Sequence, residues 1–260
     1  MTLLLLLLLA CNPFKGIDDR WNGAWEACDP EGIEGRPDPY DLDASLSADC
    51  QDRLLDDLKA DRDSLASVPA TDETPDLAAC VITGAYDLLT RDGGRFGTTE
   101  AGDGVYPVFL DQMQEVYWQL GGDDNRQLAY NYTAWFTAGV VYDDGMSEGS
   151  LAATHEDGLH LSSSVLTMCG PELGHVLFHE AGHVVLDEHV PCPEGFEIQD
   201  CPDCVDTTPP ACDTDEEGTY ALSASLLQVY VDACEDPEEE VCAYLEKMRA
   251  VEVQLVGVGG

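Results

Sequence analysis

Residues 173–186 form an apolar run that constrains the fold more than any other part of the chain. The run reads LGHVLFHEAGHVVL, and Glu180 is its only charged residue. A helix that is apolar on every side is buried in the protein. Polar groups in such a helix are costly unless they have a partner or a chemical role. We therefore expect a buried helix in which His179, Glu180 and His183 form a site.

The spacing of these three residues indicates a metal site. His179 and His183 are four residues apart, so a helix places them on one face, where both imidazoles can bind one Zn²⁺. Glu180 lies next to them and can take a proton from a water molecule bound to the metal. The alternatives are an ordinary helix with two satisfied histidines and a site that binds metal without catalysis.

This HExxH segment, with uncharged flanks and Val176 three residues before the first histidine, resembles the zincin metallopeptidases. The resemblance covers about residues 158–230. It implies an α+β fold in which a small twisted sheet lies beside the active-site helix, with a zinc cofactor and Glu180 as the general base. It also implies that residues 158–166 form an antiparallel edge strand, to which a peptide or protein substrate would add.

Two residues compete as the third zinc ligand, because catalytic zinc sites use three protein ligands and a water. His189 completes HEAGHVVLDEH, which resembles the HExxHxxGxxH of metzincins, except that Leu186 replaces the glycine. A left-handed leucine there would cost about 1–2 kcal/mol. Glu217 is the alternative, as in gluzincins and aspzincins, and Tyr220 would then bind the oxyanion. We predict His179, His183 and His189 as metal ligands and keep Glu217 as the rival.

The neighbouring polar residues have simpler interpretations. Asp213 is a natural N-cap for a helix over residues 216–233. His155 and His160 flank the predicted edge strand and lie either in the cleft or on the surface. His175 lies one turn before His179, where it either supports a ligand or lines the cleft wall.

The first eleven residues predict export. Seven leucines precede Ala10 and Cys11, a run too short to span a membrane. The segment resembles a bacterial lipoprotein signal peptide, in which the cysteine becomes the lipidated first residue, although no lysine or arginine precedes the leucines. We expect a lipid anchor on Cys11 in the bacterial cell envelope, at the outer membrane or cell surface. An ordinary secretory signal is the alternative.

The cysteine count agrees with export. Ten of the eleven cysteines remain when Cys11 is set aside, and an even number in an exported chain predicts disulfide bonds. Cys201 and Cys204 could instead be half of a zinc knuckle, but no second CxxC completes such a site. The pairing cannot be read from the sequence.

The charge excludes one class of partner. The chain has 11 basic and 52 acidic residues, a formal net charge of −41. Such a surface repels nucleic-acid phosphates and anionic lipid headgroups, so we expect no nucleic-acid partner. The acidic loops are either solvated or bind calcium, and none has EF-hand spacing.

Composition and periodicity suggest four regions. These are a signal peptide at 1–11, a tether of little regular structure at 12–43, a helical or mixed part at 44–157, and the metal-site region at 158–260 with a Cys-rich insertion at 190–212. We predict helices over 45–66, 108–120, 216–233 and 245–253, a strand over 130–142, loops over 67–76 and 91–104, and either a strand or a buried helix over 81–89.

The sequence therefore predicts an exported zinc metallopeptidase with disulfide bonds. A non-catalytic cell-surface lipoprotein that keeps a zinc site is one alternative. A zinc hydrolase acting on a substrate other than a peptide is another, because the motif specifies the metal and the water but not the acyl group.

Overall fold

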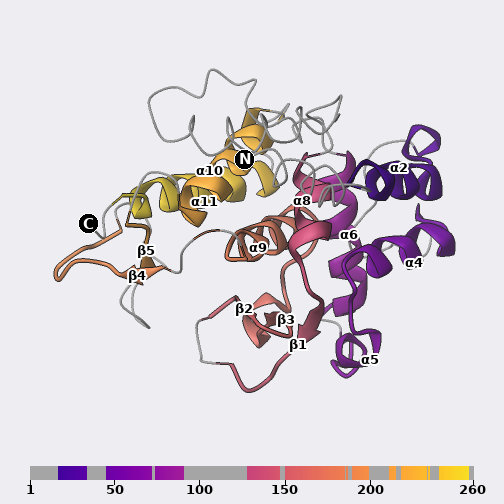
Figure 1. The fold of residues 1–260 in the computed structure, drawn as a ribbon, viewed down its shortest axis with the longest axis horizontal. Coiled ribbons are helices and arrows are strands. Elements are labelled where there is room, and N and C mark those ends of the chain that lie inside the picture. Colours follow the sequence, from indigo (N-terminus) through magenta and orange to yellow (C-terminus); the bar gives the residue numbers. More distant parts are fainter. Residues whose placement is uncertain are drawn as a thin grey trace, which may run out of the picture.

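The structure is a computed structural model with mixed α and β elements around one central helix. It describes residues 17–33, 45–71, 74–90, 128–146, 150–184, 186, 189–198, 211–214, 218–232, 234 and 240–257. The central helix is α9 (Pro171–Gly182), which carries the HExxH segment. Figure 1 shows α9 between two C-terminal helices, a group of N-terminal helices and a small sheet.

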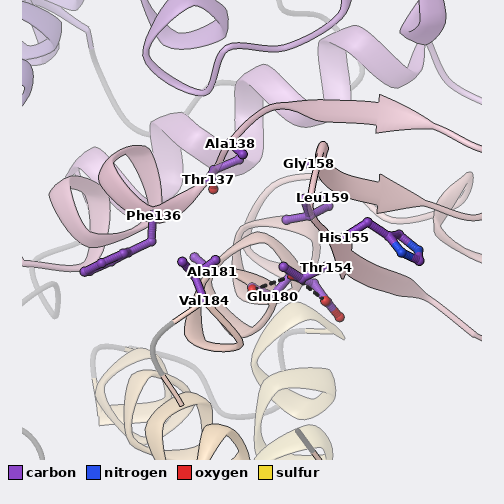
Figure 2. A pocket seen from close by; sticks show the side chains of 10 residues that line it. All are labelled: Phe136, Thr137, Ala138, Thr154, His155, Gly158, Leu159, Glu180, Ala181 and Val184. Carbon is purple, nitrogen blue, oxygen red and sulfur yellow. Dashed lines mark hydrogen bonds between the residues drawn. The ribbon is translucent and has the colours of Figure 1, made fainter. Parts of the chain in front are cut away.

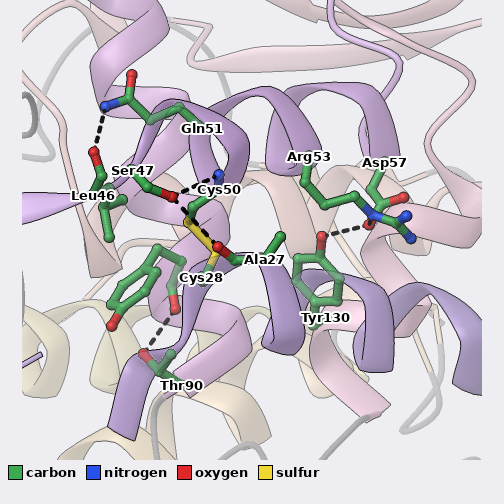
Figure 3. The surroundings of a disulfide bond; sticks show 11 residues. Ala27, Cys28, Leu46, Ser47, Cys50, Gln51, Arg53, Asp57, Thr90 and Tyr130 are labelled. Atoms are coloured by element: carbon green, nitrogen blue, oxygen red, sulfur yellow. Dashed lines mark hydrogen bonds and ion pairs between the residues drawn. A yellow bond between two sulfur atoms is a disulfide. The ribbon is translucent and has the colours of Figure 1, made fainter. Parts of the chain in front are cut away.

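The N-terminal helices pack on one another and hold a disulfide bond. Residues 17–28, within the segment expected to be a tether, form α2 (Ile17–Cys28), and a short 3-10 helix follows at Pro30–Gly32. Cys28 at the end of α2 is bonded to Cys50 in α4 (Ala48–Asp57), as Figure 3 shows. The Ser47 hydroxyl caps α4 by accepting from the Cys50 N–H. This part of the chain therefore joins the folded body.

The helix predicted over 45–66 is two helices. α4 ends at Asp57, and α5 covers only Arg62–Leu65. Between them Lys59 has a left-handed φ of 52°, which a continuous helix does not allow. The Asp61 side chain then starts α5 by accepting from the Ser64 N–H. The leucines that predicted one amphipathic helix are buried, but they lie on two separate short helices and the residues beside them. They are Leu46, Leu54, Leu55, Leu58 and Leu65.

Two further helices enclose α9. The undecided segment 81–89 belongs to α6 (Leu77–Thr90), a helix with a nearly continuous buried surface. The strand predicted over 130–142 is wrong for its first part, which forms α8 (Leu128–Phe136). Aromatic and β-branched residues favour strands only as a weak preference, and burial against neighbouring helices overrides it here. The predicted helix 108–120 and loop 91–104 lie outside the described residues.

α6 and α9 cross at a pair of glycines. A Cβ added to Gly84 would lie 2.8 Å from the Gly174 nitrogen, and a Cβ on Gly174 would lie 2.8 Å from the Gly84 oxygen. The two backbones therefore approach more closely than a side chain at either position would allow. A disulfide between Cys80 in α6 and Cys169, just before α9, ties the same two segments together. These contacts fix the position of the first turn of α9.

The sheet has three short strands in the order β1-β3-β2. They are β1 (Val140–Tyr142), β2 (Ala152–His155) and β3 (Gly158–Leu161). β3 pairs in parallel with β1 and antiparallel with β2. The strand predicted over 158–166 is therefore shorter and central, and a 3-10 helix follows it at Ser163–Val165. The antiparallel edge strand beside α9 is β2.

The C-terminal part holds a two-stranded hairpin and two long helices. β4 (Val190–Pro191) pairs antiparallel with β5 (Ala211–Cys212) inside the predicted insertion 190–212. The two predicted C-terminal helices are present as α10 (Thr219–Asp232) and α11 (Glu240–Leu255). α10 packs on both α11 and α9. Among the described residues, no helix is both long and apolar enough to cross a membrane.

The prediction of disulfide bonds is confirmed for eight cysteines. Four bonds are present, and they join Cys28 to Cys50, Cys80 to Cys169, Cys192 to Cys212, and Cys234 to Cys242. Each bond restricts the unfolded chain, which typically raises the free energy of unfolding by about 2–4 kcal/mol. Cys201 and Cys204 lie outside the described residues.

Candidate metal centre

The helix that carries the candidate ligands, α9, begins and ends at clear sequence signals. Gly170 precedes α9 with a φ of 59°, and Pro171 follows as the first helical residue, where its missing N–H is not needed. The helix ends at Gly182, with His183 as its C-cap. A Cβ on Gly182 would lie 2.9 Å from the Thr219 methyl carbon, so α10 begins against the end of α9. His179 and His183 therefore face α10.

The structure brings the three predicted ligands together. Nitrogen atoms of His179, His183 and His189 all lie within 4.8 Å of one another, on half-buried side chains. The Nε2 atoms of His179 and His189 are 3.2 Å apart. Two nitrogens bound to one tetrahedral zinc at 2.0–2.1 Å are separated by about 3.3 Å. The spacing of these histidines thus suits a single metal ion.

Asp213 orients the ring of His189. Its Oδ1 lies 2.8 Å from Nδ1 of His189, and its Oδ2 accepts from the backbone N–H of Tyr220 at 2.8 Å. The Asp213 side chain is only 3% exposed. A carboxylate only accepts hydrogen bonds, so Nδ1 of His189 carries the hydrogen and Nε2 presents a lone pair. A carboxylate behind a histidine is the usual support of a metal ligand.

Ser223 and Glu252 do the same for His179. The Ser223 hydroxyl lies 3.1 Å from Nδ1 of His179 and donates to Oε2 of Glu252 at 2.5 Å. Its single hydrogen is committed to the carboxylate, so it accepts from Nδ1–H of His179. The third ring, His183, has Nδ1 3.4 Å from the Thr219 hydroxyl.

Two lone pairs consequently point at each other across the 3.2 Å between His179 and His189. Neutral rings in this arrangement repel unless a cation lies between them. A proton shared by the rings is disfavoured, because burial holds the pKa of His179 well below its usual value and the neighbouring His183 lowers it further. A metal ion would fit between the two lone pairs.

The buried charge behind the rings agrees with a divalent ion. Asp213 and Glu252 are 4% and 3% exposed, and their side chains converge on His189 and His179. Buried carboxylates are expensive without a compensating positive charge. A metal ion held by the three rings would offset this buried negative charge.

Glu180 follows His179 directly in α9 and contacts the sheet through Thr154. The Thr154 hydroxyl on β2 lies 2.7 Å from the Glu180 carbonyl oxygen and 3.1 Å from Oε2 of the carboxyl group. Burial raises the pKa of Glu180 to about 7, and the hydroxyl contact opposes this in part. A carboxyl group with such a pKa exchanges protons readily near neutral pH.

A small hollow adjoins Glu180. Figure 2 shows Thr154 and Glu180 at one side of it, with Phe136 and Thr137 from the end of α8 opposite. Ala181, Val184 and Leu159 give it an apolar lining, and the exposed His155 stands at the end of β2. The hollow lies between α9 and the sheet, where a small group could approach Glu180.

α9 ends at Gly182, four residues before Leu186, and the Leu186 N–H donates to the Gly182 carbonyl oxygen at 2.9 Å. β4 begins directly after His189. The rival ligand Glu217 lies outside the described residues. Tyr220, expected near an oxyanion, stacks on the His189 ring with centroids 4.0 Å apart.

The remaining histidines have separate roles. His175 is buried and its Nε2 lies 2.7 Å from Oε1 of Glu252, so it supports the site and does not line a cleft. His160 on β3 lies between Asp143 and Asp157, at 3.1 Å from each. The contact with His160, and then the Gly145 N–H, lower the pKa of Asp143. His155 packs against the His160 ring.

Sequence reasoning missed three residues that support the site, namely Thr154, Ser223 and Glu252. Glu252 carried a signal, because it is a single carboxylate between Val251 and Val253 in a helix that buries one face. Thr154 and Ser223 carried none, since hydroxyl residues occur throughout the chain.

Comparisons with protein-family models, with curated proteins and with solved structures found no match to this chain. The function proposed below is inferred from the geometry of this site.

Proposed function

We propose that the protein is a zinc-dependent metallopeptidase of zincin-like fold. The observation that supports this best is the convergence of His179, His183 and His189, with Glu180 directly after His179 in α9. Three neutral histidines with an open fourth position are the ligand set of catalytic zinc. A purely structural zinc would not need a carboxyl group held next to it.

The roles of the protein's own groups follow from their contacts. A zinc ion held by the three rings would lower the pKa of a bound water to about 7 and polarise the scissile carbonyl. Glu180 takes the proton of the attacking water and passes it to the leaving amine, a task that suits its pKa of about 7. Thr154 holds the Glu180 carboxyl group through the 3.1 Å contact.

The edge of the sheet supports a peptide as the substrate. β2 lies at the end of the strand order, and no strand pairs with its outer edge among the residues that the structure describes. A peptide in extended form can add to such an edge by main-chain hydrogen bonds. Thr154 on β2 contacts Glu180, so a peptide on this edge would pass next to the general base.

We also propose that the protein works outside the cytoplasm, anchored through Cys11 to the bacterial cell envelope. The four disulfide bonds support an oxidising compartment. The anchor residue itself lies outside the described residues. The high negative charge supports the absence of a nucleic-acid partner.

The test combines metal analysis with a peptidase assay. Purified protein should hold about one zinc per chain, and the His183→Ala variant should lose it. Glu180→Gln keeps the side-chain volume and touches no ligand. It should retain zinc, while hydrolysis of an unstructured protein substrate falls by about 10²–10⁴.

The two candidates for the third ligand belong in the same assay. His189→Ala should lose zinc affinity and activity together, and Glu217→Ala should keep both. Hydrolysis by Glu180→Gln at the wild-type rate would refute the mechanism. A zinc-loaded wild type that cleaves no member of a broad peptide library would favour the non-catalytic lipoprotein or a zinc hydrolase of other substrates.

A further inference from the structure

A chain of buried polar side chains runs behind the metal centre and joins three helices. It begins at His175 in α9, passes through Glu252 in α11 and Ser223 in α10, and returns to His179 in α9. The three links measure 2.7, 2.5 and 3.1 Å. His175 and Glu252 are each 3% exposed, and Ser223 is fully buried. Glu252 lies 77 residues from His175 in sequence.

The direction of each hydrogen bond follows from the donors available. The Glu252 carboxylate only accepts, so the Ser223 hydroxyl donates to it. The Tyr220 carbonyl is a second acceptor for that hydroxyl, but at 3.4 Å it is far weaker than the charged group at 2.5 Å. The Ser223 oxygen therefore accepts from Nδ1–H of His179, which leaves a lone pair on Nε2.

His175 contacts Glu252 from the other side. Its Nε2 lies 2.7 Å from Oε1, while its Nδ1 is buried without a hydrogen-bond partner. Among the described residues, the only other ion-pair partner of Glu252 is His179, at 3.9 Å.

We propose that Ser223 and Glu252 are positioning residues of the metal centre. They hold His179 as the Nδ1–H tautomer, so that Nε2 faces the metal, and Glu252 supplies a buried negative charge that offsets the cation. This inference rests on the proposed zinc site, but it does not require that the protein be a peptidase. Residues that support a ligand in this way typically change metal affinity by about 10–100-fold.

The test uses Ser223→Ala and Glu252→Gln, with Glu246→Gln as the matched control. Glu246 is also in α11, but its side chain is 49% exposed and pairs with Arg249. Glu252→Gln removes the buried negative charge. If its NH₂ group faces Ser223, the hydroxyl also becomes a donor toward His179, and the hydrogen of that ring moves to Nε2 and blocks the ligand position.

Two measurements test this, one on metal-free protein and one on protein titrated with zinc. Nitrogen-15 NMR of the histidine rings in the metal-free protein should show the Nδ1–H tautomer of His179 in wild type and in Glu246→Gln. In the other two variants this tautomer should be lost or mixed with the Nε2–H tautomer. Competition with a chelator should show zinc binding about 10–100-fold weaker in Ser223→Ala and Glu252→Gln, and unchanged in the control.

The outcomes separate this inference from the proposed function. Wild-type zinc affinity and an unchanged tautomer in Ser223→Ala would overturn it, and so would a wild type that binds no zinc. Ser223→Ala keeps the contact between Glu252 and His175, so it decides the question if Glu252→Gln does not fold. A wild type that binds zinc but cleaves no peptide would overturn the peptidase while these affinities still support the inference.

Discussion

Replacing Asp213 by asparagine should weaken the metal centre from outside its ligand set. The Asp213 carboxylate accepts from Nδ1–H of His189 with one oxygen and from the Tyr220 N–H with the other. Asparagine has nearly the same shape but only one accepting oxygen. Whichever way the amide turns, its NH₂ group meets one of these two donors.

Both orientations carry a cost that can be estimated. If the NH₂ group faces the Tyr220 N–H, a buried donor at the start of α10 loses its acceptor, which costs about 1–3 kcal/mol. If the NH₂ group faces His189, the hydrogen of that ring moves to Nε2 and the lone pair toward the metal is lost. We expect zinc affinity to fall by about 10–100-fold, which is about 1.4–2.7 kcal/mol.

The assay is a chelator competition for zinc, together with thermal unfolding of the metal-free protein. The melting temperature should fall by about 2–4 °C for each kcal/mol lost. Asp56→Asn is the matched control, because its side chain is 73% exposed and pairs with Arg62 at the surface. It should change neither quantity. An Asp213→Asn protein with wild-type zinc affinity would refute the assigned role of this carboxylate.

Three other changes test separate parts of the protein. Gly84→Ala should cost about 1–3 kcal/mol of stability in thermal unfolding, because the new Cβ meets the Gly174 backbone at 2.8 Å; an unchanged melting temperature would contradict the close crossing. Replacing Cys192 and Cys212 together by serine should lower zinc affinity, because their bond closes the hairpin between His189 and Asp213; equal affinity in chelator competition would argue against this constraint. Cys11→Ser should move the protein from the detergent phase to the soluble exported fraction, and unchanged partitioning would show that another element holds the membrane.

Several features of the fold could be predicted because they depend on local spacing. The α9 helix, the shared face of His179 and His183, and the even set of cysteines are properties of short segments or of composition. The two C-terminal helices were predicted for the same reason, since apolar periodicity is visible in the sequence. Their ends were less accurate, because caps and fraying move a helix boundary by a few residues.

Other features depended on contacts that periodicity cannot show. Residues 130–136 have the composition of a strand but are helical, because their aromatic side chains pack among helices. β3 became the central strand because β1 and β2 pair on either side of it. Aromatic content and the alternation of apolar and polar residues describe one segment and not its neighbours. Neither could therefore distinguish a helix from a strand over residues 130–136, or a central strand from an edge strand for β3.

The metal centre shows the same division most clearly. The sequence by itself determined that two histidines and a glutamate share one short helix, because a helix repeats every few residues. Only the tertiary structure decided that His189 joins them and that Asp213, Ser223 and Glu252 hold the rings. These partners lie directly after β5, in α10 and in α11, up to 77 residues from the ring they contact. Contacts over such distances are set by how helices and strands pack together, and the spacing of residues within one segment does not determine that packing.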